Sequence, residues 1–353
     1  MKRIYSLDLL KLVFAYIIAF FHFGTTLSPG PTAAVQIFFI LSGFFLGRKF
    51  YSRSHNREGY DQWNYTLDHA KQLYPHYVFS LVIFFLYLLL RSLVHLLRQP
   101  SFSALGQIFL DLYHQIPDLL LLQSAYCSYP SLNYPMWQLS ALVIAGYFVY
   151  GLLCHNETLA RKLIFPGAIL MIQSLLFSGV PFDGNFGPFF VPLLRAFSPL
   201  CIGVLAYYFT TTPAYEALKS HSVLFNLAAV YSLVTIFAYG EYRSIFLLTT
   251  VVLIWNCWDA RSWINRLLNR RIFRFCGSFS FAVYANHALI ARFLEARVYE
   301  PMAARGAPAP QWQQNLVYFA LVTLYSAVTL FLVEKGKAIL SAKKNAEGIS
   351  SAK

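Results

Sequence analysis

Long apolar stretches separated by short polar segments run along almost the whole chain. A helix that spans a bilayer needs about 17–25 mostly apolar residues. On that template the sequence predicts ten membrane spans, at residues 7–27, 34–51, 73–97, 136–154, 163–179, 189–209, 222–239, 244–258, 276–294 and 314–334. Residues 104–123 mix polar side chains with leucines, which predicts an amphipathic interfacial or re-entrant segment. We therefore expect an all-α polytopic protein with one membrane domain over residues 1–335 and a polar cytoplasmic tail over residues 336–353.

Composition supports a membrane protein and excludes two other classes. Hydrophobic residues make up 58% of the 353 residues and charged residues only 12%. A soluble domain carries about 25% charged residues, so an ordinary cytosolic globule of this size is excluded. A disordered chain is excluded by the same numbers, because disorder requires low hydrophobicity and high charge.

The net charge of +13 could indicate a nucleic-acid partner, but the distribution of the cations favours membrane topology. If the N-terminus is cytoplasmic, 20 of the 28 Lys and Arg fall in cytoplasmic segments. Only Arg98, Arg243, Arg292, Arg297 and Arg305 lie on the opposite side, and Lys11, Arg91 and Arg195 lie within spans. This excess follows the positive-inside rule. It predicts that both termini are cytoplasmic, and we expect no nucleic-acid partner.

The first span carries three ionisable residues, Asp8, Lys11 and His22. Charges inside a bilayer are costly and usually functional. Lys11 and His22 are eleven residues apart, which brings them to within about 20° of the same helix face, and Asp8 is close enough to Lys11 for an ion pair. An imidazole that burial keeps neutral is suited to act as a general base. Alternatively, Asp8 and Lys11 only anchor the helix at the interface.

Other polar positions give weaker signals. His287 is a second buried-looking histidine, with either a functional or a structural role. Arg195 either steers an acceptor or other anion or extends towards the interface. Gly43 and Gly47 form a G-x-x-x-G pair that permits close helix packing. The five cysteines form no C-x-x-C pair, so neither a metal site nor a disulfide framework is predicted.

Several segments together resemble the acyltransferase-3 family of integral membrane O-acyltransferases. The opening SLDLLKLVFAYIIAFFHFG resembles its first helix, in which a basic residue precedes a histidine by eleven positions. FFILSGFFLG (residues 38–47), LYPHYVFS (73–80), PMWQLSALVIAGYFVY (135–150) and SFSFAVYANHALI (278–290) resemble later landmarks. Three positions depart from the pattern. Lys11 replaces the usual arginine, and His69 and Gln72 replace two arginines before the third-helix proline, which predicts a divergent member or one with a changed donor.

The resemblance implies transfer of an acyl group, often acetyl, from a cytoplasmic donor to a hydroxyl of a glycan or lipid-linked acceptor at the outer face. The cytoplasmic cations are suited to attract a nucleotide such as coenzyme A. The expected catalytic group is His22 with Lys11, Asp8 and His287, where His22 acts as base or as a transient acyl carrier. Ser42 or His287 is expected to stabilise the developing oxyanion. The expected donor site is formed by Lys11, Lys71, Arg270, Arg271, Arg274, Phe38, Phe39, Ser42 and Gly43.

We expect no bound cofactor, with acetyl-CoA or another acyl-CoA as co-substrate, in the plasma membrane of a bacterium. Membrane lipids are the remaining expected partners. Two other functions stay open. One is a transporter or flippase for a lipid-linked sugar or small anion, with Arg195, Lys11 and His22 lining its path. The other is a sensor that binds an acyl donor without turnover.

Overall fold

The computed structural model describes residues 3–27, 30–52, 60–98, 102–125, 131–180, 184–187, 189–239 and 244–350, which are almost entirely helical. The α-helices are α1 (Tyr5–Phe21), α2 (Pro31–Ser52), α3 (Gln62–Arg98), α4 (Phe102–Leu119), α5 (Trp137–Leu159), α6 (Phe165–Phe177), α7 (Val191–Phe209), α8 (Pro213–Ser220), α9 (Ser222–Tyr239), α10 (Ser244–Trp258), α11 (Trp263–Leu268), α12 (Cys276–Leu294), α13 (Glu300–Ala304) and α14 (Gln311–Ser350). Short 3-10 or π turns are η1 (Tyr134–Met136), η2 (Ala160–Ile164), η3 (Arg271–Phe275) and η4 (Glu295–Tyr299). Strands β1 (Asn185–Phe186) and β2 (Phe189–Phe190) pair antiparallel, with Asn185 opposite Phe190.

The helices form an all-α membrane protein. Within the described residues, five helical stretches are long and apolar enough to cross a bilayer, or six if α8 and α9, bent by 90°, count as one span. One of the five, Tyr134–Phe177, contains two of the predicted spans, and its backbone breaks at Asn156. The predicted total of ten spans, and the placement of the termini, therefore stay predictions. Helix α14 continues from the last predicted span into the predicted tail, as far as Ser350, and the division between membrane domain and tail stays a prediction.

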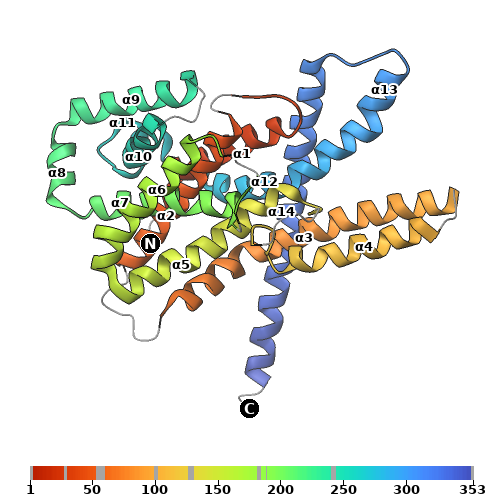
Figure 1. Ribbon diagram of the computed structural model, residues 1–353, viewed down its shortest axis with the longest axis horizontal. Coiled ribbons are helices and arrows are strands. Elements are labelled where there is room, and N and C mark those ends of the chain that lie inside the picture. Colours follow the sequence, from red (N-terminus) through yellow and green to blue (C-terminus); the bar gives the residue numbers. More distant parts are fainter. Residues whose placement is uncertain are drawn as a thin grey trace.

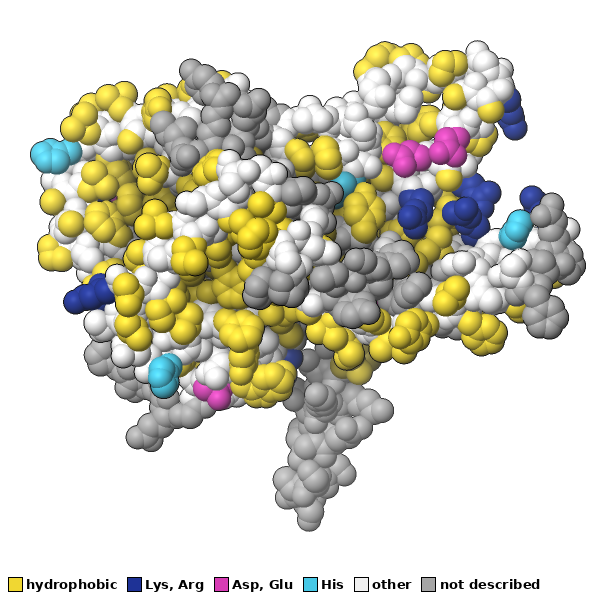
Figure 2. Space-filling model, in the orientation of Figure 1, with side chains coloured by type: hydrophobic (Ala, Val, Ile, Leu, Met, Phe, Trp, Pro, Cys, Tyr) yellow, Lys and Arg dark blue, Asp and Glu magenta, His cyan; other side chains and the backbone are white. Residues whose placement is uncertain are grey.

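Large apolar side chains remain exposed along several helices, as expected where helices face lipid. On α9 they include Val223, Leu224, Leu227, Val230, Tyr231 and Val234. Figure 2 shows hydrophobic side chains over much of the visible face. In Figure 1, α4 lies beside the later part of α3, and this hairpin extends away from the other helices, so the segment predicted to be interfacial or re-entrant forms one of its arms.

The α2–α7 pair makes the most extensive helix contact in the bundle. A Cβ atom added to Gly43 would overlap the carbonyl of Leu200, and one added to Gly203 would overlap the carbonyl of Ile40. The two backbones therefore touch, which only glycine permits. Gly47 also lies against α7, near Val204, so the predicted close helix approach is made with α7.

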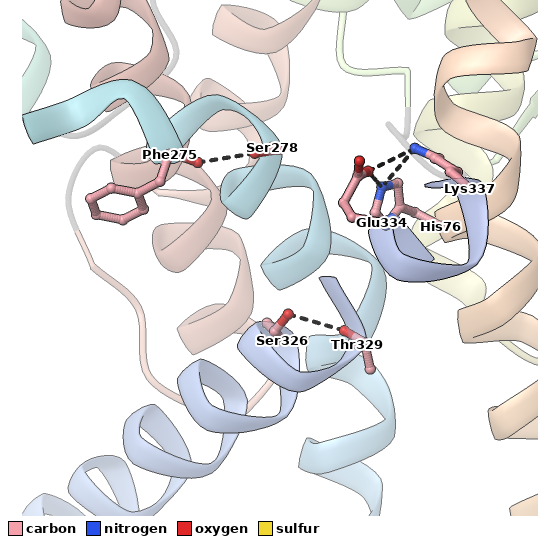
Figure 3. Close-up of polar contacts among 7 residues, drawn as sticks. All are labelled: His76, Phe275, Ser278, Ser326, Thr329, Glu334 and Lys337. Atoms are coloured by element: carbon pink, nitrogen blue, oxygen red, sulfur yellow. Dashed lines mark hydrogen bonds and ion pairs between the residues drawn. The ribbon is translucent and has the colours of Figure 1, made fainter. Parts of the chain in front are cut away.

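Helix α14 is joined to α3 by a polar cluster (Figure 3). His76 Nε2 lies 3.0 Å from Glu334 Oε1 and 3.2 Å from Lys337 Nζ. Lys337 also donates to Glu334 at 2.8 Å. Closer to the start of α14, Thr329 donates to the Ser326 carbonyl and accepts a hydrogen bond from Asn286 of α12. These contacts hold α14 against α3 and α12. Both helices line the candidate active site.

Candidate active site

His22 lies where α1 ends. The Thr25 N–H bonds to the Phe20 carbonyl and the Gly24 N–H to the Phe21 carbonyl, while Gly24 adopts a φ of +74°. This pattern is a Schellman termination, in which glycine takes the left-handed conformation that ends the helix. The chain leaves the helix soon after His22, so its half-buried imidazole lies at one end of the bundle, called here the His22 end. The opposite end of α1 is called the Asp8 end.

The imidazole of His22 pairs with that of His287 on α12. His22 Nδ1 lies 2.7 Å from His287 Nε2. The ring planes differ by 9° and their centroids are 4.9 Å apart. Because the centroids are much further apart than the bonded nitrogens, the rings meet edge to edge. The structure thus brings together two histidines that are 265 residues apart in the sequence.

The hydrogen bonds fix the tautomers of the neutral pair. His287 Nδ1 lies 2.7 Å from the Tyr284 carbonyl oxygen, which can only accept. His287 therefore carries its proton on Nδ1, and its Nε2 accepts the proton of His22 Nδ1. The remaining nitrogen, His22 Nε2, is then an unprotonated base. It has no hydrogen-bond partner among the described residues, which leaves its lone pair available for a substrate proton.

Tyr134 lies against the His22 ring, edge to face, with ring centroids 5.0 Å apart. It belongs to residues 131–137, which pack back onto the bundle through buried polar groups. Asn133 Nδ2 donates to the Ala285 carbonyl at 2.8 Å. The Tyr284 hydroxyl donates to the Pro135 carbonyl. These bonds tie Tyr134 to the same turn of α12 that holds His287.

A cavity of about 160 Å³ lies between α1, α2, α3, α5 and α12. Its lining includes four residues of the expected donor site, namely Lys11, Phe38, Phe39 and Ser42. Gly277 lines the cavity near the start of α12, and Tyr284 lines it two turns further along. The Tyr284 ring is 5.7 Å from the His287 ring, so the cavity reaches the residue that orients the histidine pair.

Two residues that line this cavity each carry a buried polar atom without a hydrogen-bond partner among the described residues. Gln138 is 7% exposed, and its Oε1 is buried without a hydrogen bond. His69 Nε2 is likewise buried and unpartnered. An unpaired buried polar atom costs roughly 1–3 kcal/mol. Both atoms are therefore expected to meet a ligand or water in the otherwise mostly apolar cavity.

The Asp8 end carries an ionic cluster. The Asp8 carboxylate accepts from Arg3 Nε at 2.5 Å and lies 4.0 Å from Lys11 Nζ. The Lys11 ammonium also lies 4.4 Å from the centre of the Phe45 ring. A Cβ on Gly277 would meet the Asp8 side chain, so glycine allows α12 to begin against this cluster. Three exposed arginines immediately precede α12, namely Arg270, Arg271 and Arg274.

The other predicted site residues lie apart from the histidine pair. Asp8 precedes His22 by 14 residues, about 21 Å along the helix. Lys71 is exposed on α3 and does not line the cavity, whereas its neighbour His69 does. Gly43 packs against α7 and is likewise absent from the cavity lining. Arg195 is buried, and its guanidinium lies over the ring of Trp137. Trp137 follows Tyr134 by about one helical turn.

Three contributors escaped the sequence reasoning. Tyr134 and Gln138 lie within the stretch around PMWQLSAL, but nothing in that stretch marks either as polar lining. Tyr284 acts through its backbone carbonyl, which any residue possesses. The one sequence signal that could have indicated Tyr284 is its position three residues before a buried histidine.

Comparison with known families now adds to this geometry. A family model described as an acyltransferase domain matches residues 4–334, nearly the whole chain. The chain belongs to the acyltransferase-3 family. No curated protein and no solved structure matches it. Membership makes the chain an acyltransferase, and the match includes the histidine pair, the cavity and the Asp8 cluster of this family member.

Proposed function

We propose that this acyltransferase moves an acyl group from an acyl-CoA, bound from the Asp8 end, to an acceptor hydroxyl at the His22 end. The observation that carries the proposal is the directed hydrogen-bond chain from the Tyr284 carbonyl through His287 to His22. It leaves His22 Nε2 as a base at the end of the bundle opposite the ionic cluster. The donor arm would reach this base through the cavity.

The chemistry of the cavity supports an acyl-pantetheine donor. Lys11, together with Arg270, Arg271 and Arg274, supplies positive charge for the nucleotide phosphates. The pantetheine arm carries two amide groups, each with an N–H donor and a carbonyl acceptor, and one hydroxyl. The unpaired Gln138 Oε1 is suited to accept from an amide N–H, and His69 Nε2 is suited to accept or to donate according to its tautomer. The position where the family pattern has an arginine thus supplies a neutral hydrogen-bonding group here.

In the proposed reaction the acceptor hydroxyl oxygen attacks the thioester carbonyl. The new C–O bond forms and the C–S bond breaks. His22 Nε2 takes the hydroxyl proton and delivers it to the departing thiolate, so the products are an ester and free coenzyme A. In the variant of this scheme, His22 Nε2 attacks the thioester carbonyl and the C–S bond breaks, which releases the coenzyme A thiolate. The acceptor hydroxyl then attacks the acyl group, the N–acyl bond breaks, and the hydroxyl proton passes to the thiolate, so the products are again an ester and free coenzyme A. His287 holds the His22 ring in either scheme.

In this proposal the acyl group is acetyl and the acceptor is a glycan or lipid-linked sugar, modified at the outer face of a bacterial plasma membrane. The Asp8 end is then cytoplasmic, as the charge distribution favours. Cysteines introduced one at a time at Arg271 and Arg305, in a background that carries Cys127→Ser and Cys154→Ser, test this orientation with an impermeant thiol reagent on intact cells. Labelling at Arg305 alone supports the proposal, and labelling of both from the same side contradicts it.

The activity is tested with purified protein in lipid nanodiscs and acetyl-CoA labelled in the acetyl group. The expected result is loss of the thioester and transfer of label to an added acceptor, or slow hydrolysis without one. Donor binding without turnover would indicate a sensor. Absence of both would favour a transporter and overturn the proposal.

A further inference from the structure

The surface around Tyr134, whose ring contacts His22, is a second candidate binding region. Figure 2 shows the surface indented between α13 and the outer part of the α3–α4 hairpin, with Lys or Arg and Asp or Glu side chains gathered there. Among the described residues near Tyr134, α3 carries Arg91 and Arg98, and the α12–η4 segment carries Arg292 and Glu295. We call Arg91, Arg98, Arg292 and Glu295 the arginine groove, with Tyr134 at its inner end.

Helix geometry places the cations of α3 on one face. Phe84, Arg91 and Arg98 are spaced by seven residues, and seven residues rotate a helix face by only about 20°. Phe84 marks where this face points, because the Arg292 guanidinium of α12 lies 5.5 Å from the centre of its ring. Arg91 and Arg98 continue the same face beyond that contact. Both are exposed, so their guanidinium groups are available to a ligand.

The groove is connected to the base. Arg292 and Glu295 are both close enough to Tyr134 to act electrostatically on its phenol. Tyr134 in turn lies against the His22 ring. The three arginines outnumber Glu295 and its neighbour Glu300, so positive charge predominates in the groove. A molecule seated on Tyr134 would therefore present a hydroxyl towards His22 while its far side meets arginines.

The cations gather at the end of the bundle where the sequence predicts few of them. Arg91, Arg98 and Arg292 make up much of the positive charge at the His22 end, whereas the proposed cytoplasmic end has many more cations. Arginine binds phosphate and carboxylate oxygens in a bidentate manner. An exposed tyrosine ring offers a stacking surface for a sugar, and Glu295 accepts from hydroxyls.

We propose that the arginine groove is the acceptor site and that the acceptor is an anionic sugar, with a phosphate or carboxylate beside the hydroxyl that receives the acyl group. This inference rests on the proposed function for the identity of the reaction, but the binding itself does not require turnover. Its anion belongs either to a soluble sugar or to a lipid-linked one.

The test measures binding of glucose 6-phosphate and glucose to the full chain in phosphatidylcholine nanodiscs, by saturation-transfer NMR. Glucose 6-phosphate is expected to bind at least fivefold tighter than glucose, and less tightly as salt rises. Arg91→Gln and Arg292→Gln should each reduce this preference at least threefold. Arg266→Gln, the same charge change on exposed α11, is the matched control and should change nothing. Equal binding of the two sugars, or equal effects of all three variants, would overturn the proposal.

Two further arms separate the possible causes. Phosphatidylglycerol in the nanodisc should not abolish glucose 6-phosphate binding, and if it does, the arginines bind ordinary anionic lipid and the proposal fails. His22→Ala should bind glucose 6-phosphate as wild type does. If labelled acetyl-CoA is never consumed but the binding contrast persists, the reaction assignment is wrong and the groove remains. If acyl transfer occurs without the contrast, only the groove is wrong.

Discussion

Two helix pairs make the most extensive contacts in the bundle, and they are built from opposite chemistry. The α2–α7 pair meets through Gly43 and Gly203, whose missing side chains let the backbones touch. The α1–α12 pair carries at one end the hydrogen bond between His22 and His287. The glycine contact fixes the relative position of α2 and α7, whereas the histidine pair supplies the proposed catalytic base.

Helix α2 contacts both regions within about one and a half turns. Phe38, Phe39 and Ser42 line the cavity next to α1 and α12, and Gly43 is pressed against α7. Rigid packing on one face of α2 therefore positions the cavity wall on another. The comparison predicts that substitutions at the glycines lower stability and that substitutions at the histidines lower turnover. The predictions below test this division of roles.

The largest effect is expected for His22→Ala. Loss of a positioned general base typically reduces the rate by about 10²- to 10⁴-fold, while folding and donor binding should stay close to wild type. The measurement is labelled acyl transfer at matched amounts of folded protein, with His221→Ala, an exposed histidine, as control. Transfer within threefold of wild type would show that His22 is not the base.

His287→Ala is expected to reduce kcat by roughly 10- to 100-fold, by analogy with the loss of hydrogen-bond partners that orient metal-bound histidines. The donor KM should stay unchanged, because His287 is absent from the cavity lining. Since the two histidines form one unit, His22→Ala combined with His287→Ala should be no slower than His22→Ala alone. Fully multiplicative losses would mean that His287 acts independently of His22.

At the glycine interface, Gly43→Ala and Gly203→Ala should each destabilise the protein by about 1–3 kcal/mol through overpacking. Gly47→Ala should cost less, because its added Cβ lies about 3.1 Å from the nearest atom. Gly336→Ala on α14 meets open space and serves as the control, with a neutral or stabilising effect. Thermal unfolding in detergent measures the series. Loss of turnover without loss of stability at Gly203 would break the division.

The sequence predicts local relations well and distant partners poorly. The eleven-residue spacing places Lys11 and His22 on one stripe of α1, and the structure keeps that stripe, with the cavity at one end and the histidine pair at the other. Gly43 was read correctly as a packing residue, but the sequence does not show that Gly203 is the partner against which it packs. A histidine in a membrane helix indicates function, whereas its bond to a second histidine depends on how α1 and α12 lie together.

The number of spans and the donor residues show the same limit. Hydropathy separates residues 136–154 from 163–179, and the structure breaks the backbone between them, at Asn156. The donor cavity contains predicted residues from α1 and α2, yet Gln138 joins it only because α5 packs beside them. Lys71 carries the expected charge, but its helix face points away from the cavity, whereas uncharged His69 faces it. Helix rotation is decided by tertiary packing, which a single sequence leaves open.

Lys11 is expected to act on donor binding with a smaller effect than either histidine has on turnover. Lys11→Ala should raise the KM for acetyl-CoA by about tenfold, as loss of one charge-assisted contact of about 1.5 kcal/mol implies. Lys11→Arg should retain or improve donor use, because arginine binds phosphate bidentately. Initial rates at varied acetyl-CoA measure both. A lowered kcat with an unchanged KM would move Lys11 from the donor site to the catalytic step.

The smallest effect is expected for the exposed arginines that precede α12. Contacts between exposed charges contribute only about 0.2–1 kcal/mol, so Arg271→Glu and Arg274→Glu should raise the donor KM by no more than about fivefold each. Salt should remove the difference, because exposed charges are screened over about 3 Å at 1 M ionic strength, whereas the effect of Lys11→Ala within the cavity should persist. The measurement is the KM for acetyl-CoA of wild type and each variant at 0.05 and 1 M salt. A donor KM that depends neither on these charges nor on salt would mean that the arginines determine only topology, and that Lys11 is the main phosphate contact.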